Sequence, residues 1–183
     1  AAVGRGGWVV IYNRLALIGL GLFASSMFCA MKRGAIAGEV TGYARSAETR
    51  DTARRIGLCD RVCDSVADAV KGADLVVLCV PVGAMGAVAA DMAPHLSAGA
   101  TVSDVGSVKR EVINAVGPHL PDGIHFVPGH PMAGTEHSGP ESGFAELFDN
   151  RWCLLVPVKG TDAEAVARLR RFWEALGSNV EEM

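Results

Sequence analysis

The sequence predicts an α/β fold, a doubly wound and mostly parallel sheet with helices on both faces. Short apolar runs alternate along the chain with stretches of helical pattern, and strands separated by single helices call for right-handed crossovers and parallel pairing. The run at 73–80, ADLVVLCV, is apolar at consecutive rather than alternate positions, which is typical of a strand buried on both faces. With 183 residues, the chain is long enough to form one full-sized domain.

The composition narrows the class of protein further. Lysine and arginine number 17 against 20 acidic residues, a net charge of −3, which argues against a nucleic-acid partner. Half of the residues are hydrophobic, which excludes a disordered chain. Glycine and small apolar residues predominate and only 6% of residues are aromatic, so an α/β domain is favoured over a β sandwich.

The first two strand–helix pairs follow from the apolar pattern near the start of the chain. Residues 15–20 form a continuous apolar run of strand type, and residues 22–32 continue at helical length without proline. A second strand is predicted at 39–44. The helix predicted at 46–56 begins at Ser46, because serine caps helix N-termini, and its charged residues supply the exposed face.

Two further pairs are predicted in the middle of the chain. Pro81 ends the strand at 73–80, and residues 84–92 are predicted to form a helix that closes before the next proline. A short strand at 100–105 and a helix at 108–116 follow. These pairs extend the same parallel sheet.

The last part of the chain is predicted to hold one more strand, at 152–156, and one more helix. Thr161 and Glu164 have the spacing of a capping box, in which each side chain bonds the backbone N–H of the other residue, so the helix is expected to begin there. Gly177 is expected to end it. Residues 179–183 resemble the start of a further element.

Residues 1–14 are predicted to be an N-terminal extension of unassigned role, and residues 15–183 the domain itself. The stretch from Leu15 to Met31 carries no charge, but its 17 residues fall short of the ~20 that a membrane span needs. Its flanks lack the cleavage pattern of a signal peptide. We therefore expect no membrane partner.

The cysteine pattern favours reduced thiols and a cytoplasmic location. The five cysteines are odd in number and lie mostly in apolar runs. Cys59 and Cys63 lack a second pair at zinc spacing, and the set His125, His130 and His137 has no recognised zinc spacing, so no metal site is expected.

A glycine-rich pattern follows the first predicted strand directly. Gly19, Gly21 and Ala24 form GxGxxA, in which the first glycine permits a tight turn, the second lets the backbone approach a pyrophosphate, and the small third residue allows close helix packing. The helix N-terminus adds free N–H groups and a partial positive charge. The pattern indicates a Rossmann-like dinucleotide-binding domain; the alternative is a purely structural turn. The residues expected to contact the dinucleotide are Gly19, Leu20, Gly21, Leu22, Phe23, Ala24, Arg45, Ser46, Val80, Pro81 and Gly106.

The end of the second predicted strand indicates which dinucleotide is bound. Enzymes that use NAD usually place an acidic residue there for the ribose hydroxyls, and this chain has none between Gly42 and Ser46. Arg45 and Ser46 could instead bind a 2′-phosphate through charge-assisted hydrogen bonds. The sequence thus predicts NADP as the preferred cofactor, with NAD possible; in the alternative, Arg45 is a solvated charge and Ser46 only a helix cap.

Four separated motifs resemble the prephenate and arogenate dehydrogenase family of tyrosine biosynthesis. They are LALIGLGL from Leu15, ADLVVLCVPV from Ala73, DVGSVK from Asp104 and GHPMAGTEHSGP from Gly129, and they occur in the family's order. The resemblance implies an NAD(P)-dependent enzyme that converts prephenate or arogenate, a small-molecule substrate, to 4-hydroxyphenylpyruvate or tyrosine by oxidative decarboxylation. The protein's part would be to orient substrate and cofactor and to manage one proton.

The resemblance also implies roles for three residues. His130 would bind the ring hydroxyl and take its proton, for which a neutral imidazole is suited. Ser107 would align that hydroxyl or the imidazole, and Glu136 would lie near the substrate entrance. The structural alternatives are that His130 only caps a turn and that Ser107 is a helix N-cap.

The chain departs from the family pattern in three ways. The third glycine of the loop is replaced by Ala24, which the bulky Phe23 precedes, and the acidic residue after the second strand is missing. The family's C-terminal helical domain, which would supply the dimer interface and basic residues for the substrate carboxylates, is not in this chain, so a homodimer is expected only together with that domain. Two other functions stay open, a non-catalytic dinucleotide-binding module and another NADP-dependent reductase on the same fold.

Overall fold

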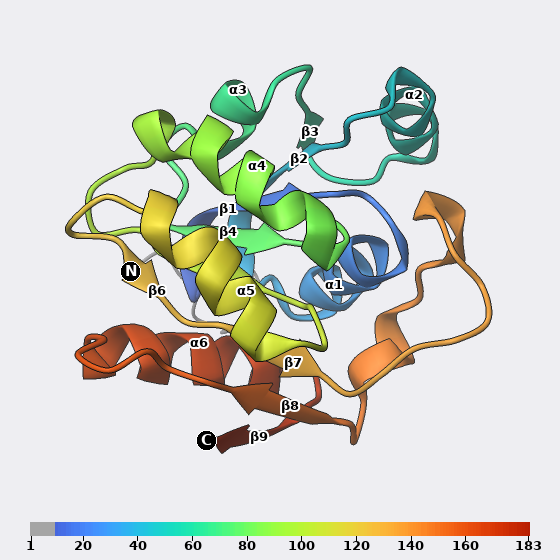
Figure 1. Ribbon diagram of the computed structural model, residues 1–183. Helices are drawn as coiled ribbons and strands as arrows, with labels where there is room; N and C mark the ends of the chain where they lie inside the picture. Colours follow the sequence, from blue (N-terminus) through green and yellow to red (C-terminus); the bar gives the residue numbers. More distant parts are fainter. Residues whose placement is uncertain (1–9) are drawn as a thin grey trace.

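A six-stranded parallel sheet forms the centre of the computed structural model, which describes residues 10–183 (Figure 1). Its strands are β1 (Tyr12–Ile18), β2 (Ala37–Tyr43), β3 (Arg61–Val62), β4 (Leu75–Leu78), β5 (Thr101–Asp104) and β6 (His125–Phe126). Their order is β3-β2-β1-β4-β5-β6, and every neighbouring pair is parallel. This is the strand order of doubly wound dinucleotide-binding folds, so the predicted fold class is confirmed.

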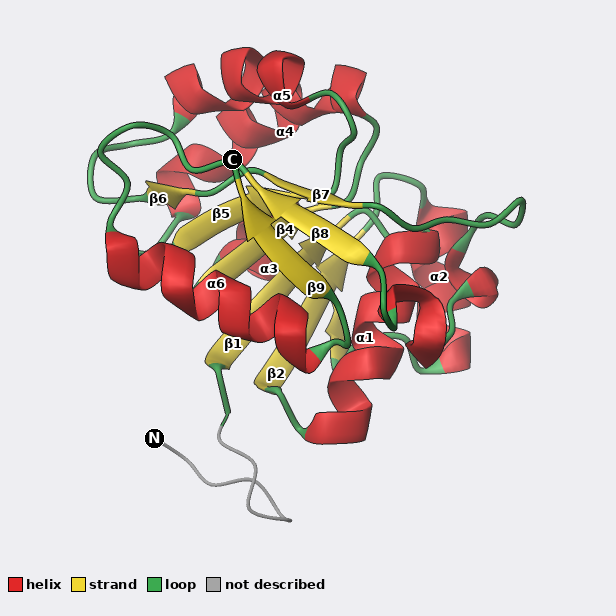
Figure 2. Cartoon of the chain, turned by 90° about the horizontal axis from the view of Figure 1, so that it is seen from below, coloured by secondary structure: helices red, strands yellow, loops and turns green. Residues whose placement is uncertain are grey.

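Helices cover both faces of this sheet (Figure 2). The helices are α1 (Leu22–Gly34), α2 (Ala47–Ile56), α3 (Val66–Val70), α4 (Val82–Met92), α5 (Lys109–Val116) and α6 (Ala163–Ala175). Alternate residues of β1 point to opposite faces, with Leu15 and Leu17 packed in one core with α1 and α6, and Ala16 and Ile18 packed in another with α3, α4 and α5. All four are fully buried, as expected of a strand covered on both sides.

A second, three-stranded sheet lies beside α6 (Figures 1 and 2). It consists of β7 (Gly129–Pro131), β8 (Trp152–Leu155) and β9 (Asn179–Glu182), with β7 antiparallel and β9 parallel to β8. Four short 3-10 helices complete the described chain, at Ala93–His95, Gly117–His119, Pro140–Ser142 and Ala145–Phe148. The strand predicted at 152–156 thus belongs to this separate sheet, not to the main one, and 179–183 supply its third strand.

The first strand begins earlier than predicted. Tyr12 is fully buried and the strand runs from Tyr12 to Ile18, so residues 12–14 of the predicted extension belong to the sheet; residues 1–9 lie outside the described residues. The reason is the carboxylate of Asp74, which accepts the N–H groups of Asn13 and Arg14, both at 2.9 Å. Four elements, β3, α3, β6 and β7, were not predicted, because two to five residues are too few to show a period.

The start of α6 also differs from the prediction. Its N-cap is Asp162, whose carboxylate accepts the N–H of Ala165 at 3.1 Å, whereas the Thr161 hydroxyl donates to the carbonyl of Val158 at 2.6 Å. The predicted capping box is therefore wrong by one residue. Gly177 follows the helix with a φ of +103°, the left-handed conformation expected at a helix end. No helix in residues 10–183 combines the length and hydrophobicity that crossing a membrane requires.

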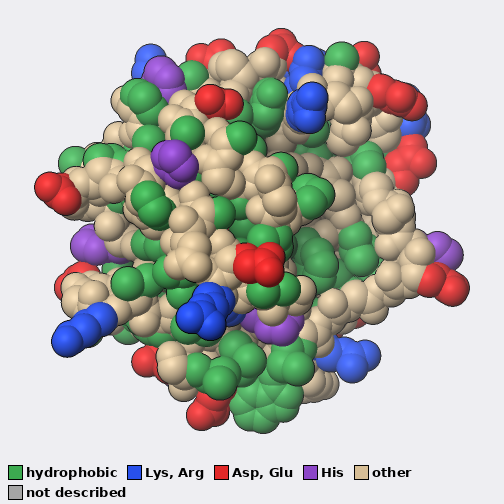
Figure 3. Space-filling model, in the orientation of Figure 1, with side chains coloured by type: hydrophobic (Ala, Val, Ile, Leu, Met, Phe, Trp, Pro, Cys, Tyr) green, Lys and Arg blue, Asp and Glu red, His purple; other side chains and the backbone are tan. Residues whose placement is uncertain are grey.

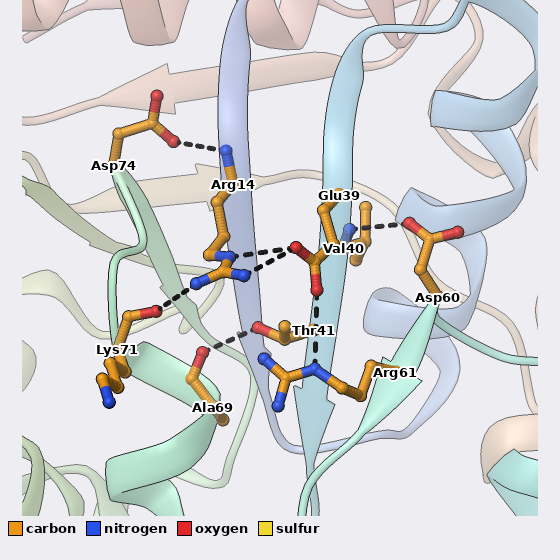
Figure 4. A network of polar contacts seen from close by, with 9 residues as sticks. All are labelled: Arg14, Glu39, Val40, Thr41, Asp60, Arg61, Ala69, Lys71 and Asp74. Carbon is orange, nitrogen blue, oxygen red and sulfur yellow. Dashed lines mark hydrogen bonds and ion pairs between the residues drawn. The ribbon is translucent and has the colours of Figure 1, made fainter.

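A polar network fixes the amino ends of the strands, at the edge of the sheet opposite their carboxyl ends (Figure 4). The Arg14 guanidinium donates to the carboxylate of Glu39 at 2.8 Å and to the carbonyl of Lys71 at 2.9 Å. Glu39 also pairs with Arg61 at 3.5 Å, so β1, β2 and β3 are linked through charged side chains. These contacts hold the register of β1, β2 and β3, and this register fixes where the carboxyl ends of the same strands lie relative to one another.

The Asp74 carboxylate gives the first testable prediction. Besides the two N–H groups of β1, it accepts a hydrogen bond from the Arg168 guanidinium at 2.9 Å, which connects α6 to the sheet. Replacing Asp74 by alanine leaves these donors without their partner and is expected to lower the free energy of unfolding by about 2 kcal/mol. Urea unfolding measures this loss. The control is Asp91→Ala, at an exposed position on α4, for which a change below about 0.5 kcal/mol is expected; equal losses would contradict the role given to Asp74.

Candidate active site

The turn between β1 and α1 has the geometry of a phosphate-binding loop. Gly19 has a φ of +99°, and a Cβ there would lie 2.8 Å from the backbone of Cys79, so the turn itself requires glycine. Gly21 differs, because a Cβ there would meet no atom within 4 Å. It is the N-cap of α1, and no side chain caps that helix end. Open space therefore lies in front of uncapped N–H groups, which suits a bound phosphate.

The other side chains of the loop mostly point away from this space. Leu20 is buried and would lie 2.9 Å from a Cβ on Gly42, and Ala24 is fully buried in the core with α1 packed closely on the sheet. Both residues can offer a dinucleotide only their backbone. The Phe23 ring is stacked on Phe148 with 6.1 Å between centroids and does not fill the space in front of Gly21.

A hollow of about 430 Å³ opens next to this loop, at the ends of β4 and β5 and beside β7. The space-filling view shows a recess lined by hydrophobic side chains on the face that carries α4, α5 and β7 (Figure 3). The hollow brings together six residues predicted from the sequence: Phe23, Val80, Pro81, Gly106, Ser107 and His130. Its volume is in the range of small-molecule sites.

His130 is the central residue of β7 and lies opposite Leu154 of β8. Its side chain is half-buried in the wall of the hollow. Burial lowers the pKa of His130, and the nearby charge of Lys109 lowers it further. The imidazole is therefore neutral at pH 7 and can accept a proton.

Ser107 lies in the loop between β5 and α5 and is exposed to the hollow. The N-cap of α5 is Val108, which makes no side-chain cap hydrogen bond, so the alternative that Ser107 only caps this helix is wrong. Its hydroxyl is thus free of a capping role, and Ser107 lines the same hollow as His130.

Glu136 is not brought to this hollow. Its side chain is 89% exposed, in the loop after β7, and its Oε1 lies 3.9 Å from Nε2 of the neighbouring His137. In the described part of the chain, no three histidine, cysteine or acidic side chains converge as metal ligands. All five cysteines carry free thiols, three of them buried and two half-buried.

Arg45 and Ser46 lie in the turn between β2 and α2. Arg45 is exposed, and its guanidinium forms no ion pair among residues 10–183, whereas the Ser46 hydroxyl accepts the N–H of Thr49 at 3.4 Å and does cap the helix. Arg50 was not predicted from the sequence; its guanidinium donates to the carbonyls of Ala44 and Arg45 at 2.8 and 2.9 Å and so shapes the turn.

Asp104 and Lys109 were also missed as functional candidates, although both belong to the DVGSVK motif. The Asp104 carboxylate is fully buried at the end of β5 and forms an ion pair with Lys109, the first residue of α5. The sequence did carry a signal for this pair, because an acidic residue ends an apolar strand and a lysine follows five residues later. Burial raises the pKa of Asp104 and lowers that of Lys109, and the pairing of the two charges opposes both shifts.

The predicted residues follow one edge of the sheet. Arg45 lies beyond β2, Gly21 beyond β1, Pro81 beyond β4 and Ser107 beyond β5, in the spatial order of these strands. Three strand spacings separate the first from the last, roughly 14 Å. Ligands of open α/β sheets bind outside the carboxyl ends of the strands, where the strand order reverses, and here the reversal falls between β1 and β4.

Known proteins resemble this chain over most of its length. The family of the nucleotide-binding domain of prephenate dehydrogenase matches residues 29–182. The cyclohexadienyl dehydrogenase of Zymomonas mobilis is 45% identical over 175 residues, which are 96% of this chain and 59% of that protein.

Two solved structures share the fold over 93% of this chain and 59% of their own. One is the arogenate dehydrogenase of Synechocystis, with 29% identity and a TM-score of 0.84. The other is the prephenate dehydrogenase of Aquifex aeolicus in complex with hydroxyphenyl propionate and NAD+, with 31% identity and a TM-score of 0.81. The chain thus spans about three-fifths of the length of these relatives.

Proposed function

Because this chain belongs to the prephenate dehydrogenase family, we propose that it acts in the NAD(P)-dependent oxidative decarboxylation of prephenate or arogenate. The observation that carries the proposal is the common hollow of Ser107 and His130, which adjoins a glycine loop with open space in front of it. The cyclohexadienyl, prephenate and arogenate dehydrogenases among the relatives support the substrate class.

In the proposed reaction, the bound nicotinamide supplies a hydride acceptor for the ring carbon that carries the hydroxyl. The chain's own part is proton handling and orientation. The neutral imidazole of His130 accepts the proton of that hydroxyl, while the Ser107 hydroxyl orients it. Loss of carbon dioxide leaves its bonding electrons in the ring, which becomes aromatic, and the resulting phenolate can take the proton back from the imidazole.

The glycine loop and the strand ends would hold the dinucleotide. The N–H groups at the start of α1 would bind the pyrophosphate, and the backbone of residues 80, 81 and 106 would line the nicotinamide end. We propose NADP as the preferred cofactor, because the turn after β2 offers the Arg45 guanidinium and no carboxylate. Cytoplasmic location, supported by the free thiols, and dimerisation through a further helical domain are parts of the same proposal.

Replacing Arg45 by alanine tests the cofactor preference. We expect the affinity for NADP to fall about 10-fold, because one charge-assisted contact with the 2′-phosphate is lost. The affinity for NAD should barely change. Fluorescence titration of the two reduced cofactors measures both constants, and Arg110→Ala, at an exposed position on α5, is the matched control. Equal losses for the two cofactors would show that Arg45 does not bind the phosphate.

The function itself is tested by thermal shift with NADP and NAD, followed by assays of this chain, and of a version extended by the family's C-terminal helical domain, with prephenate and with arogenate. Formation of the reduced cofactor together with carbon dioxide is expected with at least one of the two substrates. Cofactor binding with no turnover of either substrate by either version would favour the non-catalytic module. Activity only with an unrelated substrate would favour another reductase on this fold.

A further inference from the structure

The roles proposed for Ser107 and His130 require that two separate segments keep a fixed distance from one another. We propose that the buried pair of Asp104 and Lys109 is the positioning unit that ties the loop carrying Ser107 to the strand carrying His130. This inference rests on the proposed function, from which the roles of Ser107 and His130 are taken.

The Asp104 carboxylate binds the backbone next to both residues. Its Oδ2 accepts the N–H of Gly106 at 2.8 Å, and its Oδ1 accepts the N–H of Gly129 at 3.1 Å. Gly106 precedes Ser107 and Gly129 precedes His130. One side chain with no exposed surface therefore cross-links the two segments, which lie more than 20 residues apart in the sequence.

Lys109 completes the arrangement from α5. Its Nζ pairs with Oδ2 of Asp104 and donates to the carbonyl of Gly129 at 2.5 Å, so both backbone groups of Gly129 are held by the pair. A Cβ on Gly129 would lie 2.9 Å from the carbonyl oxygen of Asp104 and 3.3 Å from the Ser103 hydroxyl. The strand carrying His130 thus lies directly on the end of β5, with no room for a side chain between them.

The pair also sets the charge around the imidazole. The charged groups that influence His130 are Lys109 from α5 and Asp104 from β5; the former lowers its pKa and the latter raises it. Cys153 of β8 stays protonated, since burial raises the pKa of its thiol to about 12. Because the effect of Lys109 is the larger of the two, the pair favours the neutral imidazole that accepts a proton.

A general contribution to the stability of the fold does not explain why the charges of Asp104 and Lys109 are buried. Two charges lose their hydration on burial, and apolar residues of similar size often stabilise a fold equally well. The contacts of Asp104 and Lys109 instead converge on the residues next to Ser107 and His130, where apolar side chains could not hold the backbone N–H and carbonyl groups.

The test is an NMR titration of His130, whose signal is assigned by its absence in His130→Asn. In Lys109→Gln the pKa of His130 is expected to rise, and in Arg110→Gln, which removes the same charge from the next and exposed residue of α5, it is expected to stay unchanged. Turnover of Lys109→Gln should fall about 100-fold with the cofactor Kd unchanged, and the pH at which kcat/KM falls should move upward with the pKa.

A double variant covers the case in which Lys109→Gln does not fold. Asp104→Asn/Lys109→Gln removes both charges and leaves no buried charge unpaired, and a smaller rise in the pKa of His130 is expected. An unchanged pKa of His130 in either folded variant overturns the inference. The titration needs no turnover. A wild-type protein that is inactive with both substrates even when it is extended by the C-terminal helical domain would refute the proposed function, while the titration would still decide on the positioning pair.

Discussion

Replacing His130 by asparagine is expected to lower turnover by about 10²- to 10⁴-fold while the Kd of the cofactor stays nearly the same. Asparagine keeps a polar side chain of similar reach in the wall of the hollow but cannot take a proton. The glycine loop and the turn after β2 would be untouched, because His130 lies in the separate three-stranded sheet. Loss of activity without loss of cofactor binding would place His130 in the chemical step and not in cofactor binding.

The pH dependence of the wild-type protein checks the same assignment. Only the neutral imidazole accepts a proton, so kcat/KM should be constant above the pKa of His130 and should fall as the pH drops through it. Since burial and Lys109 lower this pKa from the ordinary 6.5, the decline should begin below that pH. His119→Asn, at an exposed position, is the control. A His130→Asn variant with wild-type turnover, or a pH profile that does not change in it, would contradict the proposed base.

The sequence was sufficient for β1, β2, β4 and β5 of the main sheet and for the helices α1, α2, α4 and α5, because those elements show a clear apolar pattern; β3, α3 and β6 were too short to predict. The segment at 73–80 owes its apolar run to burial on both faces, and the segment at 22–32 owes its pattern to the helical period. Neither pattern depends on distant contacts to be recognised. The second sheet is different. Its strand β7 has three residues and no period, and it exists because it pairs with β8, more than 20 residues later.

The residues of the site also differ in whether they depend on local or on distant contacts. Residues that act through a local turn, such as Gly19 and Gly21, were predictable from spacing. Asp104 was not, because its function depends on Gly129, and only the folded structure brings these two residues together. Glu136, expected near the substrate entrance, stays a prediction, because its exposed side chain does not line the hollow and no substrate contact can be assigned to it.

The two glycines of the β1–α1 turn are expected to respond to the same substitution in opposite ways. Gly21→Ala should change the free energy of unfolding by less than about 1 kcal/mol, because a Cβ there meets no protein atom and the backbone is extended, at a φ of −103°. It should weaken cofactor binding about 10- to 100-fold, because that space is where a pyrophosphate would approach the backbone. Chemical denaturation and cofactor titration on the same sample measure both quantities.

Gly19→Ala is the matched variant, two residues away. Its alanine must adopt a φ of +99° and place a Cβ 2.8 Å from the backbone of Cys79, so a loss of at least about 3 kcal/mol in the free energy of unfolding is expected. Gly19 is therefore needed to fold the turn, whereas Gly21 is needed only for what binds to it. Unchanged cofactor affinity in Gly21→Ala would mean that the dinucleotide does not lie over this loop, and the proposed site would have to be abandoned.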